Sequence, residues 1–372
     1  MKKLLGVALM LALCASSAFA LGAPARTLGL RFGTWTPQGF NAEADTTFLN
    51  GASANTATAT FQDTTEAFNA ANADWGAMGY DANGAHPVFR VWISGSFVSV
   101  DTAFVLCEMS WDKHNWLTAA SAAASNGMGG ETKQAISVPF VWAAATGNLT
   151  SQLSGASLVA APYARFIIKA DGNTAARQAA LRCNVVYRDV RDSAVPLPQM
   201  VTRRIQWGSF AVNGFNAVKD TSSIKFAAPD TTQWIDGSEM ASGPANVAGL
   251  VADSTQGFGT IAIIYTDPST VDSLYIQQET SATKSEVCKV ELKASTVFGM
   301  GTGAPGSGFT NNSAASSGSH YVHGFGSNHP QTARHGDAEL APFLRWIIRG
   351  GNGGEVMGGA YGWITYWRVP RK

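Results

Sequence analysis

Ala161-Pro-Tyr-Ala-Arg-Phe-Ile-Ile-Lys169 recurs, with conservative changes, as Ala341-Pro-Phe-Leu-Arg-Trp-Ile-Ile-Arg349. Two further segments also occur twice, in the same order along the chain: Phe32 to Asn41 matches Trp207 to Asn216, and Val100 to Lys113 matches Val271 to Lys284. One such match can arise by chance, whereas three in order indicate an internal repeat. The sequence therefore predicts two tandem copies of one module.

Short alternating segments separated by Gly, Asn, Asp, Ser and Pro clusters predict an all-β protein. The strands expected in the first copy are Phe89 to Ile93, Ala103 to Trp111, Arg165 to Lys169 and Leu181 to Arg188. In the last of these, alternation places Leu181, Cys183, Val185 and Tyr187 on a core face. We expect the same core face in the second copy from Tyr361, Trp363, Thr365 and Trp367, and hence two jelly-roll-like β-sandwiches.

The predicted organisation has four parts. Residues 1–20 form a signal peptide, residues 21–190 the first sandwich, residues 191–202 a linker stiffened by proline, and residues 203–372 the second sandwich. Near residues 299–337 the second copy carries an insertion rich in Gly, Ser and His. We expect this insertion to be a long exposed loop.

The leader has the three parts of a secretory signal: Lys2 and Lys3, an apolar run from Leu4 to Ala15, and the small-residue site Ala18-Phe19-Ala20. No later stretch has the length of a membrane span. The expected location is therefore secreted or at the cell surface. A formal net charge of zero gives no electrostatic reason to expect nucleic acid as a partner.

The turn after one predicted strand reads Ser110-Trp-Asp-Lys-His-Asn-Trp116, and Tyr163-Ala-Arg165 follows much later. This pattern resembles the galactose-binding-like (discoidin-type) jelly-roll sandwiches, in which Ser-x-Asp-Gly-x-x-Trp precedes a Tyr-x-Arg strand. Lys113 stands where that group usually has glycine. The resemblance covers the later part of each module and implies a jelly-roll fold, and it says little about a ligand.

Two charged residues recur at matching positions of the copies, within otherwise apolar strands. Glu108 corresponds to Glu279, and Arg165 corresponds to Arg345. A single buried charge is costly, so the carboxylate and the guanidinium of each copy are expected to pair. Because both copies keep them, we interpret these residues as structural pairs rather than as a site.

The same turn is also the best candidate for ligand binding. Exposed Trp rings provide flat apolar faces for sugars, and Asn, Asp and His can bind the hydroxyls. The candidate residues are Trp111, Asp112, His114, Asn115 and Trp116. Packing of the two Trp rings into the core is an equally good interpretation.

Four histidines lie close together in the predicted insertion: His320, His323, His329 and His335. Neutral imidazoles can hold a transition metal, but this spacing matches no established zinc motif. We therefore expect no cofactor, with a metal at these histidines as the alternative.

Three cysteines remain after the leader: Cys107, Cys183 and Cys288. Buried free thiols are expected, with a Cys107–Cys183 disulfide as the alternative.

No catalytic signature appears in the sequence, so an enzyme is not favoured. The low fraction of charged residues, 14% against about 25% in typical soluble domains, favours self-association. We expect an exported, non-enzymatic structural or adhesive protein that associates with itself. The alternatives are a carbohydrate-binding protein and, third, a double-jelly-roll glycan hydrolase or amidase.

Overall fold

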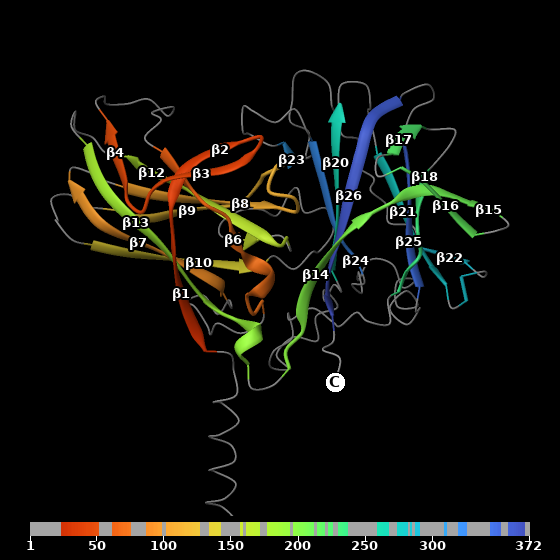
Figure 1. Cartoon of the computed structure of the whole chain (residues 1–372), viewed down its shortest axis with the longest axis horizontal. Coiled ribbons are helices and arrows are strands. Elements are labelled where there is room, and N and C mark those ends of the chain that lie inside the picture. The colour runs from red at the N-terminus through yellow and green to blue at the C-terminus, as the bar shows by residue number, and fades with distance from the viewer. Residues whose placement is uncertain are drawn as a thin grey trace, which may run out of the picture.

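The described part of the chain is built almost wholly from β-strands (Figure 1). The computed structural model describes residues 24–51, 62–75, 87–98, 102–126, 134–142, 157–158, 161–171, 177–193, 196–211, 214–219, 222–225, 230–236, 259–267, 274–281, 283–284, 287–290, 309–310, 319–325, 343–350 and 356–368. The predicted signal peptide lies outside these residues. Within them, no helix is long and apolar enough to span a bilayer. The all-β prediction is confirmed.

Two sheets, in which most strands pair in an antiparallel manner, form the first sandwich. Sheet 1 has the order β1 (Ala25–Leu30), β13 (Arg177–Arg188), β7 (Pro87–Val98), β10 (Gln134–Trp142) and β11 (Ser157–Leu158), with β4 (Thr47–Gly51) also pairing β13. Sheet 2 has the order β3 (Gly39–Ala44), β2 (Phe32–Thr36), β5 (Gln62–Thr65), β12 (Tyr163–Asp171), β8 (Thr102–Ser110) and β9 (Leu117–Asn126), with β6 (Phe68–Asn69) pairing β12.

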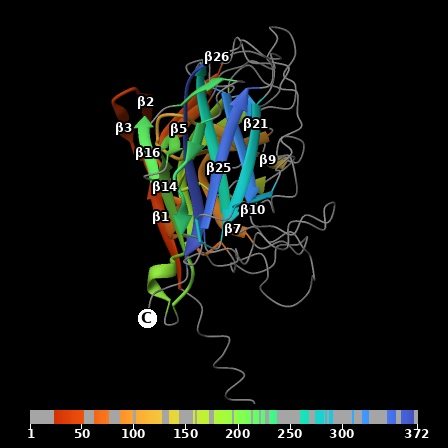
Figure 2. The ribbon, with the colours of Figure 1, turned by 90° about the vertical axis from the view of Figure 1, so that its right-hand side faces the viewer.

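Two further sheets form the second sandwich, beside the first (Figures 1 and 2). Sheet 3 has the order β14 (Gln199–Ile205), β26 (Val356–Arg368), β20 (Gly259–Asp267), β24 (Ser319–Phe325) and β23 (Phe309–Thr310), with β17 (Ser222–Lys225) pairing β26. Sheet 4 has the order β16 (Gly214–Lys219), β15 (Trp207–Ala211), β18 (Asp230–Thr232), β25 (Phe343–Gly350), β21 (Leu274–Ser281) and β22 (Val287–Val290), with β19 (Ile235–Asp236) pairing β25. The strand order of the second pair is the same as that of the first, and the internal repeat stays a prediction.

The core of the first sandwich lies between sheets 1 and 2. Phe89 of β7 and Phe140 of β10 each contact Phe166 of β12, with ring centroids 5.7 Å apart in both cases. The predicted core face of β13 is also present, since Leu181, Cys183, Val185 and Tyr187 are all buried. Alternation along that strand was therefore sufficient to identify its inner side.

The core face predicted for β26 is wrong. The residues that face the second core lie one position away from those expected. Leu30 of β1 pairs with Cys183, and Ile205, its counterpart in β14, pairs with Gly362 rather than with Trp363. A shift of one residue moves every side chain to the other face of the sheet. Ile364 and Tyr366 therefore lie on the side of the second core, and Trp363 lies on the opposite side.

Two predicted boundaries also differ from the structure. Strand β14 begins at Gln199, so the last residues of the predicted linker belong to sheet 3. The insertion near residues 299–337 contains β23 and β24, and β24 pairs with β20 over seven positions. Within the described residues, this part of the chain is a strand and not the expected loop. Tyr321, Val322 and Phe325 belong to the residue types that are enriched in strands.

Candidate functional site

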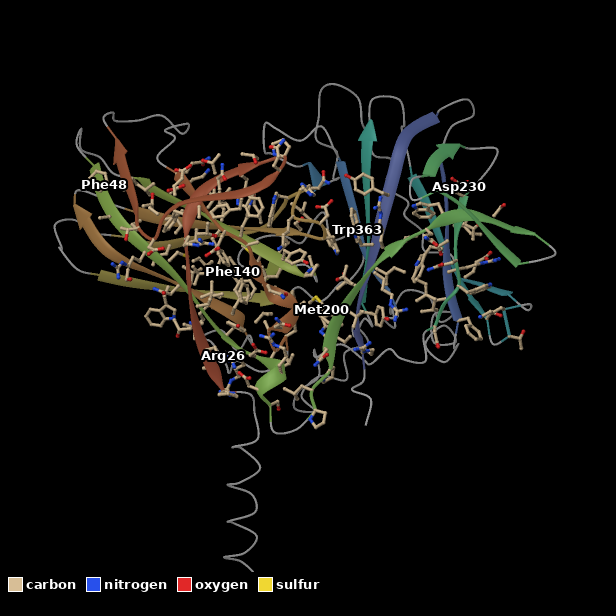
Figure 3. All side chains as sticks on the ribbon, viewed as in Figure 1. Arg26, Phe48, Phe140, Met200, Asp230 and Trp363 are labelled. Atoms are coloured by element: carbon tan, nitrogen blue, oxygen red, sulfur yellow. The ribbon has the colours of Figure 1, made fainter. Side chains whose placement is uncertain are left out.

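The turn that follows β8 lies against the second sandwich. The indole Nε1 of Trp111 donates to the hydroxyl of Thr365 at 3.1 Å, and the amide of Asn115 donates to the hydroxyl of Tyr361 at 2.7 Å. Trp75 adds an edge contact to Trp367, with ring centroids 6.1 Å apart. The labelled Met200 and Trp363 mark this contact zone between the sandwiches in Figure 3.

Hydrogen bonds within the turn hold its backbone in place. Ser110 Oγ accepts from the backbone N–H of Lys113 at 2.9 Å. Asp112 Oδ1 accepts from the N–H groups of His114 and Asn115, each at 2.8 Å, and Asp112 Oδ2 accepts from the Asn115 amide. The Asp112 carboxylate is thus engaged by its own turn, in the manner of an Asx turn.

Lys113 adopts a left-handed backbone conformation, with a φ of 64°. A non-glycine residue is uncommon there, and glycine adopts this conformation without cost. This is the position at which the discoidin-type pattern has glycine. Lys284, at the matching place in the second sandwich, has a φ of 68°, so both turns use the same conformation.

The two Trp rings of the turn do not form the exposed platform that a sugar ring requires. Trp111 and Trp116 are each only 3% exposed. Trp111 packs into the contact zone, and Trp116 makes an edge contact with Trp35 at 4.8 Å. Of the five predicted ligand-binding residues, only His114 is exposed. Ligand binding by this turn stays an untested prediction, without the accessible rings on which it was based.

Arg165 and Glu108 lie opposite each other on β12 and β8 and form a buried ion pair. The guanidinium contacts Glu108 Oε2 at 2.6 Å. It also lies 4.3 Å from the ring centroid of Trp116 and 5.3 Å from that of Trp35. Burial lowers the pKa of Arg165 from its usual value, and the Glu108 carboxylate acts in the opposite direction. The pair is therefore held by charge, hydrogen bonds and aromatic stacking together.

Arg345 and Glu279 form the corresponding pair in the second sandwich, at 2.5 Å. Here the guanidinium stacks on Trp234, 4.5 Å from the ring centroid. Trp234 follows β18, whereas Trp116 precedes β9, so a different part of the module supplies the ring. The sequence comparison missed this exchange because Trp116 and Trp234 occupy positions that do not match.

Two threonines at matching positions tie the strands beneath these ion pairs. Thr65 Oγ1 accepts from the backbone N–H of Phe166 at 3.0 Å, and Thr232 Oγ1 accepts from that of Trp346 at 2.9 Å. Both threonines are fully buried. The residues shared by the two copies thus perform the same structural tasks twice.

The predicted metal site is only partly within the described residues. His320 and His323 lie in β24, where they pair with Ile264 and Ile261 of β20. His329 and His335 lie outside the described residues. Among the residues that were described, no group of three or more His, Cys, Asp or Glu side chains is placed to hold a metal ion. The metal site stays a prediction.

Cys107 and Cys183 are buried free thiols, as expected. Burial raises the pKa of both thiols above the usual value, and the nearby Glu108 contributes for Cys107. The neutral form is therefore favoured, and neither thiol has the lowered pKa of a reactive cysteine. Cys288 lies in β22.

Comparison with known proteins does not assign the chain to a family. No family model and no curated protein match the chain. Solved structures that match include the PBSX exported protein XepA, at 10% identity over 90% of this chain and 93% of that one, with a TM-score of 0.18. Others are a tandem CBM22 domain from Paenibacillus barcinonensis Xyn10C (10% identity, 94% and 99% coverage, TM-score 0.21) and the glycosylasparaginase PNGase F from Flavobacterium meningosepticum (6% identity, 93% and 96% coverage, TM-score 0.22). TM-scores and identities this low carry no argument about function.

Proposed function

We propose that this chain is an exported, non-enzymatic structural or adhesive protein whose two sandwiches act as one rigid body. The observation that carries the proposal is the buried contact between the sandwiches. A flexible pair of modules would keep a polar, hydrated contact, whereas here aromatic side chains fill the zone. Trp363 and Trp367 of sheet 3 belong to the same buried cluster as the core of the first sandwich.

Directional bonds add to this contact. Thr365 accepts from Trp111 and lies 2.9 Å from the hydroxyl of Thr202, so β14 and β26 are both tied to the turn. Burial raises the pKa of Tyr361, and the Asp112 charge adds to that effect. The hydrogen bond from Asn115 acts in the opposite direction and lowers the pKa.

The two shared glutamates and the carboxylate of the turn after β8 give little support to a hydrolase. Glu108 and Glu279 are bound in ion pairs with arginines, and Asp112 is bound by its own turn. A glycosidase needs two acids that face a common substrate across roughly 5 to 9 Å. These three acids serve the scaffold instead, which supports a structural role over a catalytic one.

Self-association is the finer part of the proposal. The low fraction of charged residues leaves the surface with little electrostatic repulsion between copies. Export through the predicted leader at residues 1–20 would place such a protein outside the cytoplasm, where it can assemble on a surface.

The test is a size measurement on the mature chain, lacking residues 1–20, by light scattering coupled to size-exclusion chromatography over a hundredfold range of concentration. We expect species larger than the monomer, whose mass lies below the 39.0 kDa of the full chain, and their size should grow with concentration. A strict monomer at the highest concentration would contradict self-association. Limited proteolysis tests the rigid contact separately: cleavage near residues 193–198 should leave the two sandwiches together on the column.

A further inference from the structure

The outer face of sheet 1 is the side of that sheet that points away from the first core. It carries the exposed side chain of Trp92, which is 38% exposed, at the centre of β7. We propose that this face is a binding site for an acidic polysaccharide, in which Trp92 stacks on a sugar ring and the neighbouring arginines bind its carboxylates or sulfates. The inference deepens the adhesive role proposed above by naming the site and its ligand class.

The register of sheet 1 places polar groups around the ring. Trp92 pairs with Asn184 of β13, and Asn184 pairs with Gly29 of β1. A Cβ added at Gly29 would lie 3.4 Å from Asn184 Oδ1, so the glycine leaves the space beside that amide open. The indole therefore borders a flat, accessible strip with a hydrogen-bonding amide at its edge. Flat apolar surface with a few polar groups beside it suits a sugar ring.

Two arginines flank Trp92 on the same face. Arg90 lies two residues before Trp92 on β7, and Arg182 lies diagonally across on β13, where it pairs with Ser94. Arg182 is exposed, and its Nε donates to the hydroxyl of Thr46 at 3.3 Å. Within the described residues, neither guanidinium pairs with a carboxylate. Both are thus available for a charged ligand, and guanidinium groups bind carboxylates and sulfates in a bidentate manner.

The charge of the whole sheet points to the same class of ligand. The six strands of sheet 1 contain no Asp or Glu, and they contain arginine at positions 26, 90, 177, 182 and 188. The strands of sheet 1 thus carry only positive charges in a chain with zero formal net charge; Arg26 is offset by Asp192 and Asp189 just beyond β13, and Arg90 and Arg182 remain beside Trp92. Such a local excess attracts a polyanion even when the whole protein is neutral.

The second sandwich shows why this face is a separate feature of the first. There, Trp363 takes the position of Asn184, and Ala262 takes that of Trp92. The outer face of sheet 3 is covered by the first sandwich and buries its aromatic residue. In sheet 1 the described residues leave the corresponding face uncovered, with Trp92 and also Phe48 of β4 exposed. Figure 3 labels Phe48.

Binding is tested with the mature protein and three polymers: polygalacturonate, neutral dextran and oligodeoxythymidine. Isothermal titration calorimetry at physiological salt should show binding of polygalacturonate alone. Trp92→Ala should weaken it about tenfold, as expected for a central aromatic contact. Arg90→Gln and Arg182→Gln should weaken it and reduce its salt dependence. Arg203→Gln, which removes an exposed arginine from sheet 3, is the charge-matched control and should leave binding unchanged.

Each other outcome overturns the inference. Equal binding of dextran would remove the role of charge, and equal binding of oligodeoxythymidine would identify a general polyanion surface. A loss of affinity in Arg203→Gln as large as that in Arg182→Gln would indicate diffuse attraction, as would full affinity in Trp92→Ala. Absence of binding would also overturn it. Because self-association is measured by size without any glycan, failure of the site and failure of the proposed assembly are told apart.

Discussion

Strands β13 and β26 hold the same place in sheets 1 and 3, yet the outer side of β13 is largely accessible and that of β26 is buried. In β13 the outer residues are Arg182, Asn184 and Val186, which are exposed or half-buried. In β26 the matching side carries Trp363 and Thr365, which are buried against the first sandwich. The two matching strands thus both keep an apolar inner face, which the fold needs, and their outer faces differ. One outer face joins the two sandwiches, and the other is left for solvent or a partner.

A second difference concerns the aromatic ring that covers the buried arginine. Trp116, next to β9, covers Arg165, and Trp234, next to β18, covers Arg345. The ion pair and its stacking are preserved, while the source of the ring is not. What the two copies retain is therefore an arrangement of interactions, and residue-by-residue comparison identifies only part of it.

The largest effect is expected where the outer faces differ most. Trp363→Ala should lower the free energy of unfolding by about 3 to 5 kcal/mol, because it leaves a cavity in the contact between the sandwiches. The matched change Asn184→Ala, on the partly exposed face of β13, should cost no more than about 0.5 kcal/mol. Urea denaturation of both variants measures the difference. Equal losses would mean that the contact zone contributes no special stability.

The next effect concerns the ion pairs. Glu108→Gln should destabilise the protein by about 3 kcal/mol, because the buried Arg165 loses its countercharge and keeps only its ring contacts. Glu279→Gln should cost less, since the side chain of Arg345 is 14% exposed against 9% for Arg165. Thermal unfolding of the two variants ranks them. A larger loss for Glu279→Gln would contradict this ordering.

The smallest expected effect is a loss of folding stability at acid pH. Asp189 is fully buried at the end of the first sandwich, and Arg368 takes its place in the second. Hydrogen bonds from the side chain of Arg191 lower the pKa of Asp189, against the opposing effect of burial. The charged form is thus favoured by folding, so its stabilisation is present above the unfolded pKa of about 3.9 and is lost as the pH falls through the lower folded pKa.

Denaturant midpoints between pH 2 and pH 6 would measure that loss. Asp189→Asn should be less stable than the parent chain at pH 6 and should approach its stability at the acid end. Parallel curves for the two proteins would show that Asp189 does not contribute to acid sensitivity.

The inner faces were predictable from the sequence because of alternation in strands with a single apolar side. In β13 the large apolar residues at Leu181, Cys183 and Val185 alternate with polar ones, so the core face was identified correctly. In β26 both sides carry aromatic residues, and alternation could not choose between Trp363 and Ile364. Only the pairing of Ile205 with Gly362 settled the register.

The candidate site was less predictable than the fold. That Glu108 and Arg165 pair followed from the cost of a lone buried charge, which is a local argument. That Trp111 and Trp116 are buried did not, because their covering groups, Thr365, Trp35 and Arg165, come from distant parts of the chain. The exposed Trp92 gave no signal, since an outward tryptophan in a strand looks the same in sequence as an inward one.

The sequence by itself determined the class of fold, the order of the repeated segments and the ion pairs, because these depend on residue period and on charge within neighbouring strands. Tertiary structure alone decided which outer face is covered and which is open. The second sandwich covers part of the first through β26. That contact joins residues far apart in the sequence, such as Trp111 and Thr365, which are separated by 254 positions. Contacts between residues so distant in sequence depend on how the two folded sandwiches pack together, and no local pattern encodes them.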